Sequence, residues 1–126
     1  MAEVTAEKNE KIGEMNFGSI YPHYLNRIEK QGRTKAELDQ VILWLTGYKQ
    51  DTLDSFIAGN GTFADFFTDA KMHQNADMIK GVVCGYRIEE IPEEFALYRD
   101  CRRMEKLIDE LAKGRKMEKI LREEKK

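Results

Sequence analysis

The residues best suited to chemistry gather in two short stretches of the chain. The first holds Tyr21, His23 and Tyr24, and the second holds Trp44 and Tyr48. If the segments that carry them pack together, the rings could line a pocket in which His23 carries a proton near neutral pH. Tyr and Trp also sit at core edges, and a His without a carboxylate nearby in the sequence is more often structural. The five residues are a candidate pocket, and the alternative is a core edge, where we expect Trp44 to act as an anchor.

Metal and phosphate chemistry have little support. The two histidines and two cysteines, His23, His73, Cys84 and Cys101, show no ligand spacing. No glycine-rich phosphate loop is recognisable. Because the cysteines form no CxxC pair and have apolar neighbours, we expect buried, reduced thiols. We therefore predict neither a metal nor a cofactor.

A possible helix-turn-helix lies at 35–58, with Gly47 as the turn glycine. The second helix of such a motif would present Asp51 and Asp54 to DNA, with no Arg or Lys in the helix to offset them. Negative charge opposes the electrostatic term that dominates DNA affinity. We interpret the segment as a helical hairpin used for packing, with a DNA reader as the alternative.

Charge is unevenly distributed along this chain of 126 residues, whose net charge is −2. Residues 27–35 hold four basic side chains and one acidic, residues 36–70 hold one basic and six acidic, and residues 113–126 hold seven basic and three acidic. The acidic middle would weaken any attraction of nucleic acid to the basic stretches. The longest apolar run, 41–45, is far shorter than the roughly 20 residues of a membrane span, and the N-terminus has no signal-peptide pattern. We expect a cytoplasmic protein.

Helix is the predicted structure throughout. Capping residues, glycine stops and helical spacing of apolar residues favour it over strand, whose strict alternation is missing. Predicted helices cover 19–30, 34–46, 49–58, 62–68, 77–91, 93–114 and a last short segment around 117–121. We expect an all-α, compact bundle of about six or seven helices, with 1–15 as a flexible N-terminal segment and 16–126 as one helical domain.

Residues 78–91 are the ambiguous part of this prediction. Val82, Val83 and Ile88 suit a strand, whereas the overall apolar spacing suits a helix. Helix is our choice, with a buried strand as the alternative. In a helix, Gly81 and Gly85 would share one face and let another backbone approach closely, so they form a candidate helix-contact face.

Several blocks of the sequence resemble a known family. They are 19–24 (SIYPHY), 32–34 (GRT), 44–48 (WLTGY), 79–91 (IKGVVCGYRIEEI), 107–114 (LIDELAKG) and 117–122 (MEKILR). On these blocks the chain is similar to a family of small bacterial proteins, domain of unknown function 2200. The resemblance implies a bacterial cytoplasmic protein and carries over no activity or site residue.

These observations favour a helical binding or interaction module, with a protein partner or self-association and no membrane. The first alternative is a nucleic-acid-binding regulator that uses the 35–58 hairpin and the basic tail. The second is a small enzyme with a pocket near His23 and Trp44.

Overall fold

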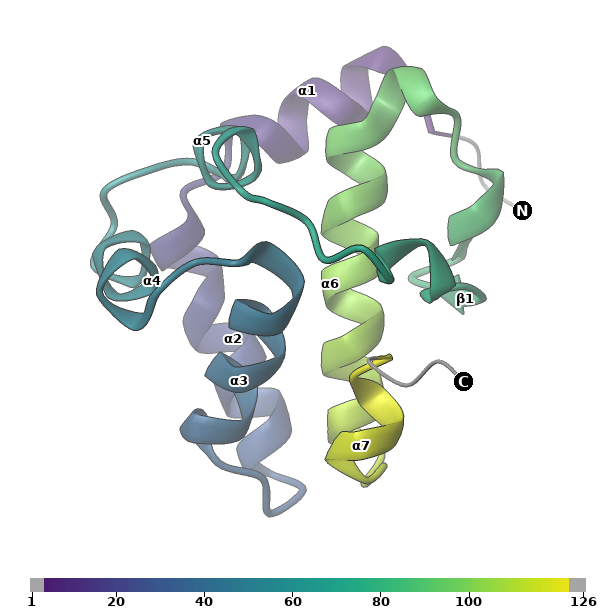
Figure 1. Cartoon of the computed structure of the whole chain (residues 1–126). Coiled ribbons are helices and arrows are strands. Elements are labelled where there is room, and N and C mark those ends of the chain that lie inside the picture. The colour runs from purple at the N-terminus through teal and green to yellow at the C-terminus, as the bar shows by residue number, and fades with distance from the viewer. Residues whose placement is uncertain (1–3, 123–126) are drawn as a thin grey trace.

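The computed structural model describes residues 4–122. Within them the chain forms α1 (Ala6–Glu14), α2 (Phe17–Glu29), α3 (Lys35–Thr46), α4 (Gln50–Ile57), α5 (Phe63–Thr68), α6 (Ala96–Ala112) and α7 (Met117–Ile120). Helix α6 runs through the middle of the molecule and contacts α1, α2, α3, α5 and α7 (Figure 1). The predicted all-α bundle of six or seven helices is confirmed.

Helix α6 has this central place because one side of it is apolar along its whole length. Its buried side chains recur every three or four residues, which keeps them on one stripe of a helix. The buried apolar members are Tyr98, Cys101, Met104, Leu107, Ile108 and Leu111. The helices around α6 cover this stripe and complete the core.

Local capping starts α3 and α5 at the positions that the sequence predicts. The Thr34 hydroxyl accepts from the Glu37 backbone N–H, while the Glu37 carboxylate accepts from the Thr34 backbone N–H, so the two residues form a capping box. Thr62 and Asp65 form the same arrangement at α5. Gly47 ends α3 with φ of 74°, in the left-handed region that favours glycine.

The predicted hairpin at 35–58 is present as α3 and α4 joined by a short turn. Helix α4 buries Leu53 in the core and leaves Asp51 and Asp54 exposed. Its outward face is therefore acidic. The three phenylalanines of α5 are in the core, where Phe66 stacks on Phe17 with ring centroids 4.3 Å apart.

The predicted helix over 78–91 is wrong. The segment forms β1 (Val82–Val83) and β2 (Tyr86–Arg87), paired antiparallel, between 3₁₀ turns at Ala76–Met78 and Ile88–Glu90; a third 3₁₀ turn, Glu93–Phe95, precedes α6. Gly81, Cys84 and Gly85 have φ of 106°, 54° and 83°, values that a right-handed helix does not allow.

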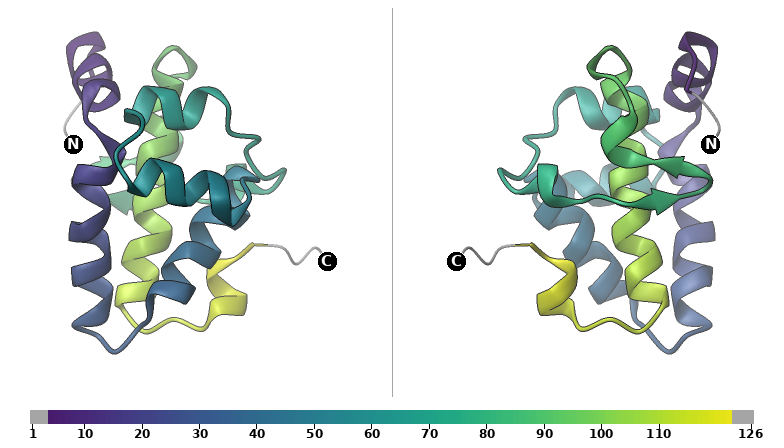
Figure 2. Two further views of the ribbon diagram at one scale, coloured as in Figure 1. Left: turned by 90° about the vertical axis from the view of Figure 1, so that its left-hand side faces the viewer. Right: turned by 90° about the vertical axis from the view of Figure 1, so that its right-hand side faces the viewer.

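The two glycines consequently do not form a helix-contact face. A Cβ at Gly85 would meet nothing within 4 Å, and one at Gly81 would meet only the Lys106 side chain. Instead, Gly81 directly precedes β1 and Gly85 lies in the loop of a hairpin that lies across α6 and points its tip toward α2 (Figure 2, right). The strand alternative thus holds for four residues, but only Val83 and Tyr86 of these are buried.

The expected flexible segment 1–15 is mostly helical where it is described. Residues 1–3, like 123–126 of the basic tail, lie outside the described residues. Thr5 caps α1 by accepting from the Lys8 backbone N–H, and the helix contacts α5 and α6. Gly13 is buried there and Ile12 partly so. Because the segment is mostly polar, its composition did not predict that this side of α1 packs against other helices.

Candidate functional site

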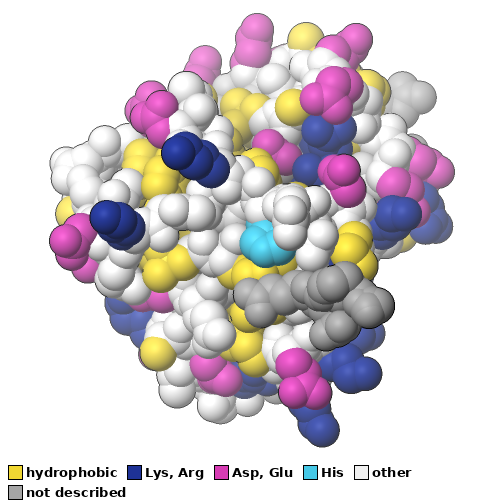
Figure 3. Space-filling view, in the orientation of Figure 1, with side chains coloured by type: hydrophobic (Ala, Val, Ile, Leu, Met, Phe, Trp, Pro, Cys, Tyr) yellow, Lys and Arg dark blue, Asp and Glu magenta, His cyan; other side chains and the backbone are white. Residues whose placement is uncertain are grey.

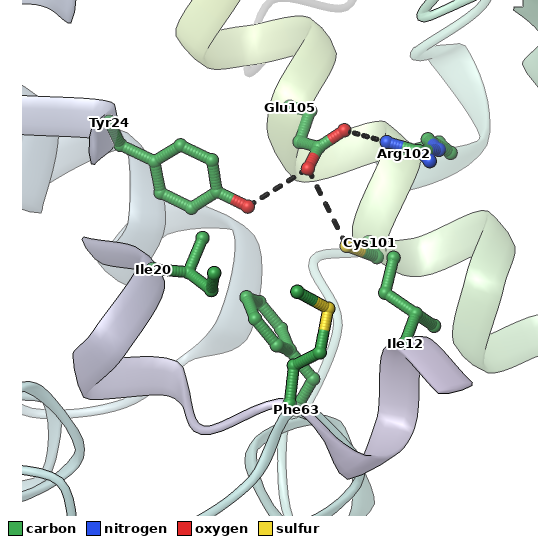
Figure 4. A pocket seen from close by; sticks show the side chains of 8 residues that line it. Ile12, Ile20, Tyr24, Phe63, Cys101, Arg102 and Glu105 are labelled. Carbon is green, nitrogen blue, oxygen red and sulfur yellow. Dashed lines mark hydrogen bonds and ion pairs between the residues drawn. The ribbon is translucent and has the colours of Figure 1, made fainter. Parts of the chain in front are cut away.

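A cavity of about 200 Å³ opens between α1, α2, α5 and α6. It is lined by apolar side chains on one side and by polar ones on the other (Figure 4). The apolar residues are Ile12, Met15, Ile20 and Phe63, and the polar residues are Tyr24, Cys101, Arg102 and Glu105. These residues are called the pocket below.

The apolar side is built where α1 turns into α2. At this corner the Phe63 N–H donates to the Met15 carbonyl at 2.8 Å, and the Phe17 N–H donates to the Gly61 carbonyl at 3.0 Å. These two backbone hydrogen bonds attach the corner to the start of α5. The apolar side chains of three helices therefore meet at a fixed place.

The polar side is organised by the carboxylate of Glu105. The Tyr24 hydroxyl donates to its Oε2 at 2.9 Å, and Arg102 donates from Nη1 to its Oε1. The Cys84 thiol approaches Oε1 at 3.5 Å and the Cys101 thiol approaches Oε2 at 3.9 Å. Because a carboxylate offers about four lone-pair positions, these four donors saturate it. The network joins α2, α6 and the hairpin tip.

The donors around Glu105 hold their protons. Burial raises the pKa of the Tyr24 hydroxyl, with further raising by Cys101 and Glu105, and burial raises the pKa of the Cys101 thiol well above its usual value. Burial and the charge of Glu105 also raise the pKa of Cys84. A nucleophilic cysteine needs a lowered pKa. Both thiols are therefore placed as hydrogen-bond donors rather than as reactive groups.

Aromatic rings hold Arg102 in position. Its Nη2 donates to the Tyr98 hydroxyl at 2.7 Å, and its guanidinium carbon lies 4.7 Å from the centroid of that ring. The Tyr86 ring is 5.4 Å from the same carbon and meets Tyr98 edge to face. Cation–π contacts of this kind stabilise a desolvated guanidinium. Arg102 is thereby fixed beside Glu105.

A second cavity, of about 190 Å³, lies between α5 and α6. It is lined by Ala64, Phe67, Thr68, Ala96, Leu97 and Asp100. Asp100 forms an ion pair with Arg103 at 3.2 Å, and burial raises its pKa. This second cavity has no counterpart of the Glu105 network, and it serves as a matched control for the pocket.

Of the predicted pocket residues on α2, Tyr24 alone lines the pocket. Tyr21 is buried and its hydroxyl donates to Asp39 of α3, so it joins two helices inside the core. His23 is exposed on α2 and does not line the pocket. The pKa of Tyr21 is raised by its burial and by Asp39.

The predicted pocket residues around α3 lie elsewhere in the molecule. Trp44 is half-buried against the core and stacks on His73, with ring centroids 4.1 Å apart. Tyr48 is also half-buried and donates to the Phe66 carbonyl; burial raises its pKa to about 12. The five residues therefore do not share one pocket, and Trp44 has the expected place at the core edge.

The prediction of two buried thiols holds for Cys101 and is wrong for Cys84, which is exposed at the hairpin tip. This error follows from the predicted helix over 78–91. Sequence reasoning also missed Arg102 and Glu105. Their only local signal is spacing, since Glu105 follows Cys101 by one helical turn.

Comparison with known proteins identifies relatives without assigning a function. Residues 11–122 match the family described as "Uncharacterized protein conserved in bacteria (DUF2200)". The structure is similar to the crystal structure of uncharacterized protein SP1917, with a TM-score of 0.84 and 33% sequence identity over 93% of this chain and 97% of that one. The comparison with curated proteins finds no match.

Across 4–122, no three or more His, Cys, Asp or Glu side chains are grouped so that they could hold a metal ion. No helix in that range is both long and apolar enough to cross a membrane.

Proposed function

The chain belongs to the DUF2200 family, and we propose that it is a protein interaction module of the bacterial cytoplasm whose pocket receives an apolar side chain of a protein partner. The observation that carries this proposal is the contrast between the two sides of the pocket. The Glu105 carboxylate on the polar side is already saturated by its own hydrogen bonds, and the apolar side is not covered.

The saturation of Glu105 argues for an apolar occupant. A ligand that bonded to this carboxylate would have to displace Tyr24, Arg102 or a thiol, and a displaced Tyr24 hydroxyl would lose its hydrogen bond in a buried position. An apolar group displaces none of them. Contact with Ile12, Ile20 and Phe63 removes apolar surface from water, which is favourable.

The size of the cavity argues for a single side chain. Sites for small molecules and cofactors typically measure about 300–1,000 Å³, whereas this one measures about 200 Å³. Burial of one aliphatic or aromatic side chain contributes about 1.5–3 kcal/mol. That is enough for an anchor within a larger interface and too little for tight binding by itself. Met15, 45% exposed at the rim, extends the apolar surface beyond the cavity.

The proposal assigns no role to nucleic acid or to His23. Helix α4 turns Asp51 and Asp54 to solvent, and these charges would repel DNA phosphates. His23 is exposed and takes no part in the network around Glu105. A protein partner is favoured over both alternatives drawn from the sequence.

The proposal is tested by NMR titration with N-acetyl-L-leucinamide, a probe that carries one apolar side chain and no charge. The energy of one buried side chain corresponds to a dissociation constant of about 5–100 mM. We expect shifts confined to the methyl signals of Ile12, Met15 and Ile20. Ile20→Trp, which fills the pocket, should abolish them, whereas Thr68→Trp, which fills the second cavity, should preserve them.

Shifts that spread over the surface, or that persist in Ile20→Trp, would contradict the proposal. If Ile20→Trp does not fold, Met15→Lys at the exposed rim should still weaken the shifts. To extend the test to a natural partner, the immobilised parent and both Trp variants are each incubated with a bacterial cell extract, and the retained proteins are compared. A protein retained by the parent and by Thr68→Trp but lost by Ile20→Trp supports the pocket, and one retained by all three argues against it.

A further inference from the structure

The fold brings together two basic stretches that are far apart in the sequence. The α2–α3 loop and the α6–α7 loop lie side by side at the lower end of the molecule in Figure 1. Arg33 donates from Nη1 to the Arg115 carbonyl across this contact at 2.8 Å. Figure 3 shows Lys and Arg side chains at the lower edge, with Asp and Glu side chains among them.

Some of these basic side chains are already neutralised by acidic neighbours. Ion pairs engage Arg27 and Lys113 with Asp109, Arg33 with Glu37, Lys35 with Asp39 and Arg122 with Glu110. Among the basic residues of 27–35 and 113–122, four are exposed and have no ion pair within 4–122: Lys30, Arg115, Lys116 and Lys119. These four residues are called the basic end. Glu29 and Glu118 are exposed nearby, so the excess charge is positive but moderate.

Exposed acidic residues, opposite in charge to the basic end, lie on α4 and α5. They are Asp51, Asp54, Asp65 and Asp69, all exposed and without an ion pair in the described chain. These residues are called the acidic face. The two helices lie next to each other on the side of the molecule away from the hairpin (Figures 1 and 2). Lys49 and Lys71 flank this face, so its excess charge is also moderate.

We propose that the basic end of one copy of this chain docks on the acidic face of a second copy. The two surfaces carry moderate excess charges of opposite sign, and they lie on different sides of the molecule. One copy can therefore use both at once, in a head-to-tail contact of the heterologous kind. This inference does not depend on the pocket.

A second copy suits the basic end better than a nucleic acid does. The whole chain carries a net charge of −2, and its acidic face would repel a polyanion bound to the same molecule. A second copy instead uses that acidic face as the partner surface. Charge complementarity of this kind guides association and fixes orientation more than it adds affinity.

Sedimentation velocity at two salt concentrations tests the proposal. The screening length falls from about 30 Å at 0.01 M salt to about 3 Å at 1 M. We expect concentration-dependent association at low salt that disappears at high salt. Arg115→Gln/Lys116→Gln and Asp51→Asn/Asp54→Asn should each weaken it by about 2- to 30-fold, the effect of two exposed ion pairs. Glu10→Gln/Glu14→Gln, which removes exposed acids of α1, is the matched control and should associate like the parent.

A mixing experiment separates the head-to-tail arrangement from other contacts. The first double variant retains its acidic face and the second retains its basic end, so an equal mixture should form one-to-one pairs that do not grow. A mixture that stays monomeric while the parent associates would overturn the arrangement. So would association that is insensitive to salt, or a parent that remains monomeric at low salt.

Fluorescence anisotropy with a labelled DNA duplex tests whether the basic end binds nucleic acid instead of a second copy of this chain. Under the proposal, the parent binds the duplex no better than either double variant does. Binding that is lost in Arg115→Gln/Lys116→Gln and strengthened in Asp51→Asn/Asp54→Asn would assign the basic end to nucleic acid and overturn the proposal.

Discussion

For Gly18 in α2, helix propensity and packing predict opposite effects of replacement by Ala on stability. Replacement of Gly by Ala inside a helix ordinarily stabilises it by about 1 kcal/mol. Gly18, in the first turn of α2, has no room for this change. A Cβ there would lie 2.6 Å from the Ile57 carbonyl oxygen and 2.8 Å from the Gly59 nitrogen, both backbone atoms.

Gly13 of α1 is the matched control. Its Cβ would also meet an atom at short distance, Cδ2 of Leu97 at 2.7 Å, with the Ala64 Cβ next at 3.3 Å. The nearest atom here is the end of a flexible and partly exposed side chain, which can rotate away. The same substitution therefore meets a movable neighbour at Gly13 and an immovable one at Gly18.

Insertion of a methyl group against fixed atoms typically costs about 1–3 kcal/mol, and more where the backbone must move. We expect Gly18→Ala to lose about 2 kcal/mol of unfolding free energy, which lowers the Tm by about 8 °C for a domain of this size. Gly13→Ala should stay within about 1 kcal/mol of the parent. Urea unfolding followed by circular dichroism measures both changes. If Gly18→Ala is as stable as the parent, the close approach of α2 to the end of α4 is refuted.

Three further predictions concern other parts of the chain. The pKa of Tyr86 is lowered, chiefly by its hydrogen bond from a lysine, and the pKa values of the other four tyrosines are raised, so absorbance at 295 nm should show one tyrosine that ionises before the rest. Because tyrosines with raised pKa values ionise more easily in the unfolded chain, the free energy of unfolding should fall as pH rises from 10 toward about 12, the raised pKa of Tyr48. Thr34→Ala removes the cap of α3 and should lower the unfolding free energy by about 1 kcal/mol in urea, while Thr34→Ser should restore it. Trp44→Ala should lower the free energy of unfolding by about 2–4 kcal/mol, because Trp44 is half-buried. His73→Ala should shift the fluorescence emission of this single tryptophan to longer wavelength, and an unchanged spectrum would refute the stacked pair.

Local signals in the sequence predict most of the helical framework. The capping box of Thr34, the glycine after α3 and the apolar stripe of α6 all act within a few residues of their own positions. Such signals can be recognised without knowledge of the fold. Segment 78–91 is different because its apolar spacing fits both a helix and a strand. The left-handed backbone at Gly81, Cys84 and Gly85 decides against the helix.

The pocket depends on contacts that no local signal reports. Glu105 receives hydrogen bonds from Tyr24 and Cys84, which are far from it in the chain. Its selection requires knowledge that α2 and the hairpin tip both reach α6. The predicted pocket instead grouped residues by chemical type, and Tyr21 and Trp44 turned out to contact different partners. Residue type indicates which side chains can do chemistry, and topology decides which of them meet.

Cys84 shows how the hairpin and the pocket constrain each other. It occupies the first position of a two-residue hairpin loop, with positive φ at both Cys84 and Gly85, where Asn, Asp or Gly would be less strained. Glycine would form the turn equally well, so turn formation does not explain a thiol at this position. The contact with Glu105 does, because the thiol supplies one of the four donors that saturate the carboxylate. The strained residue of the hairpin thus helps to keep the polar side of the pocket closed to ligands, and the apolar side is left as the surface that can bind.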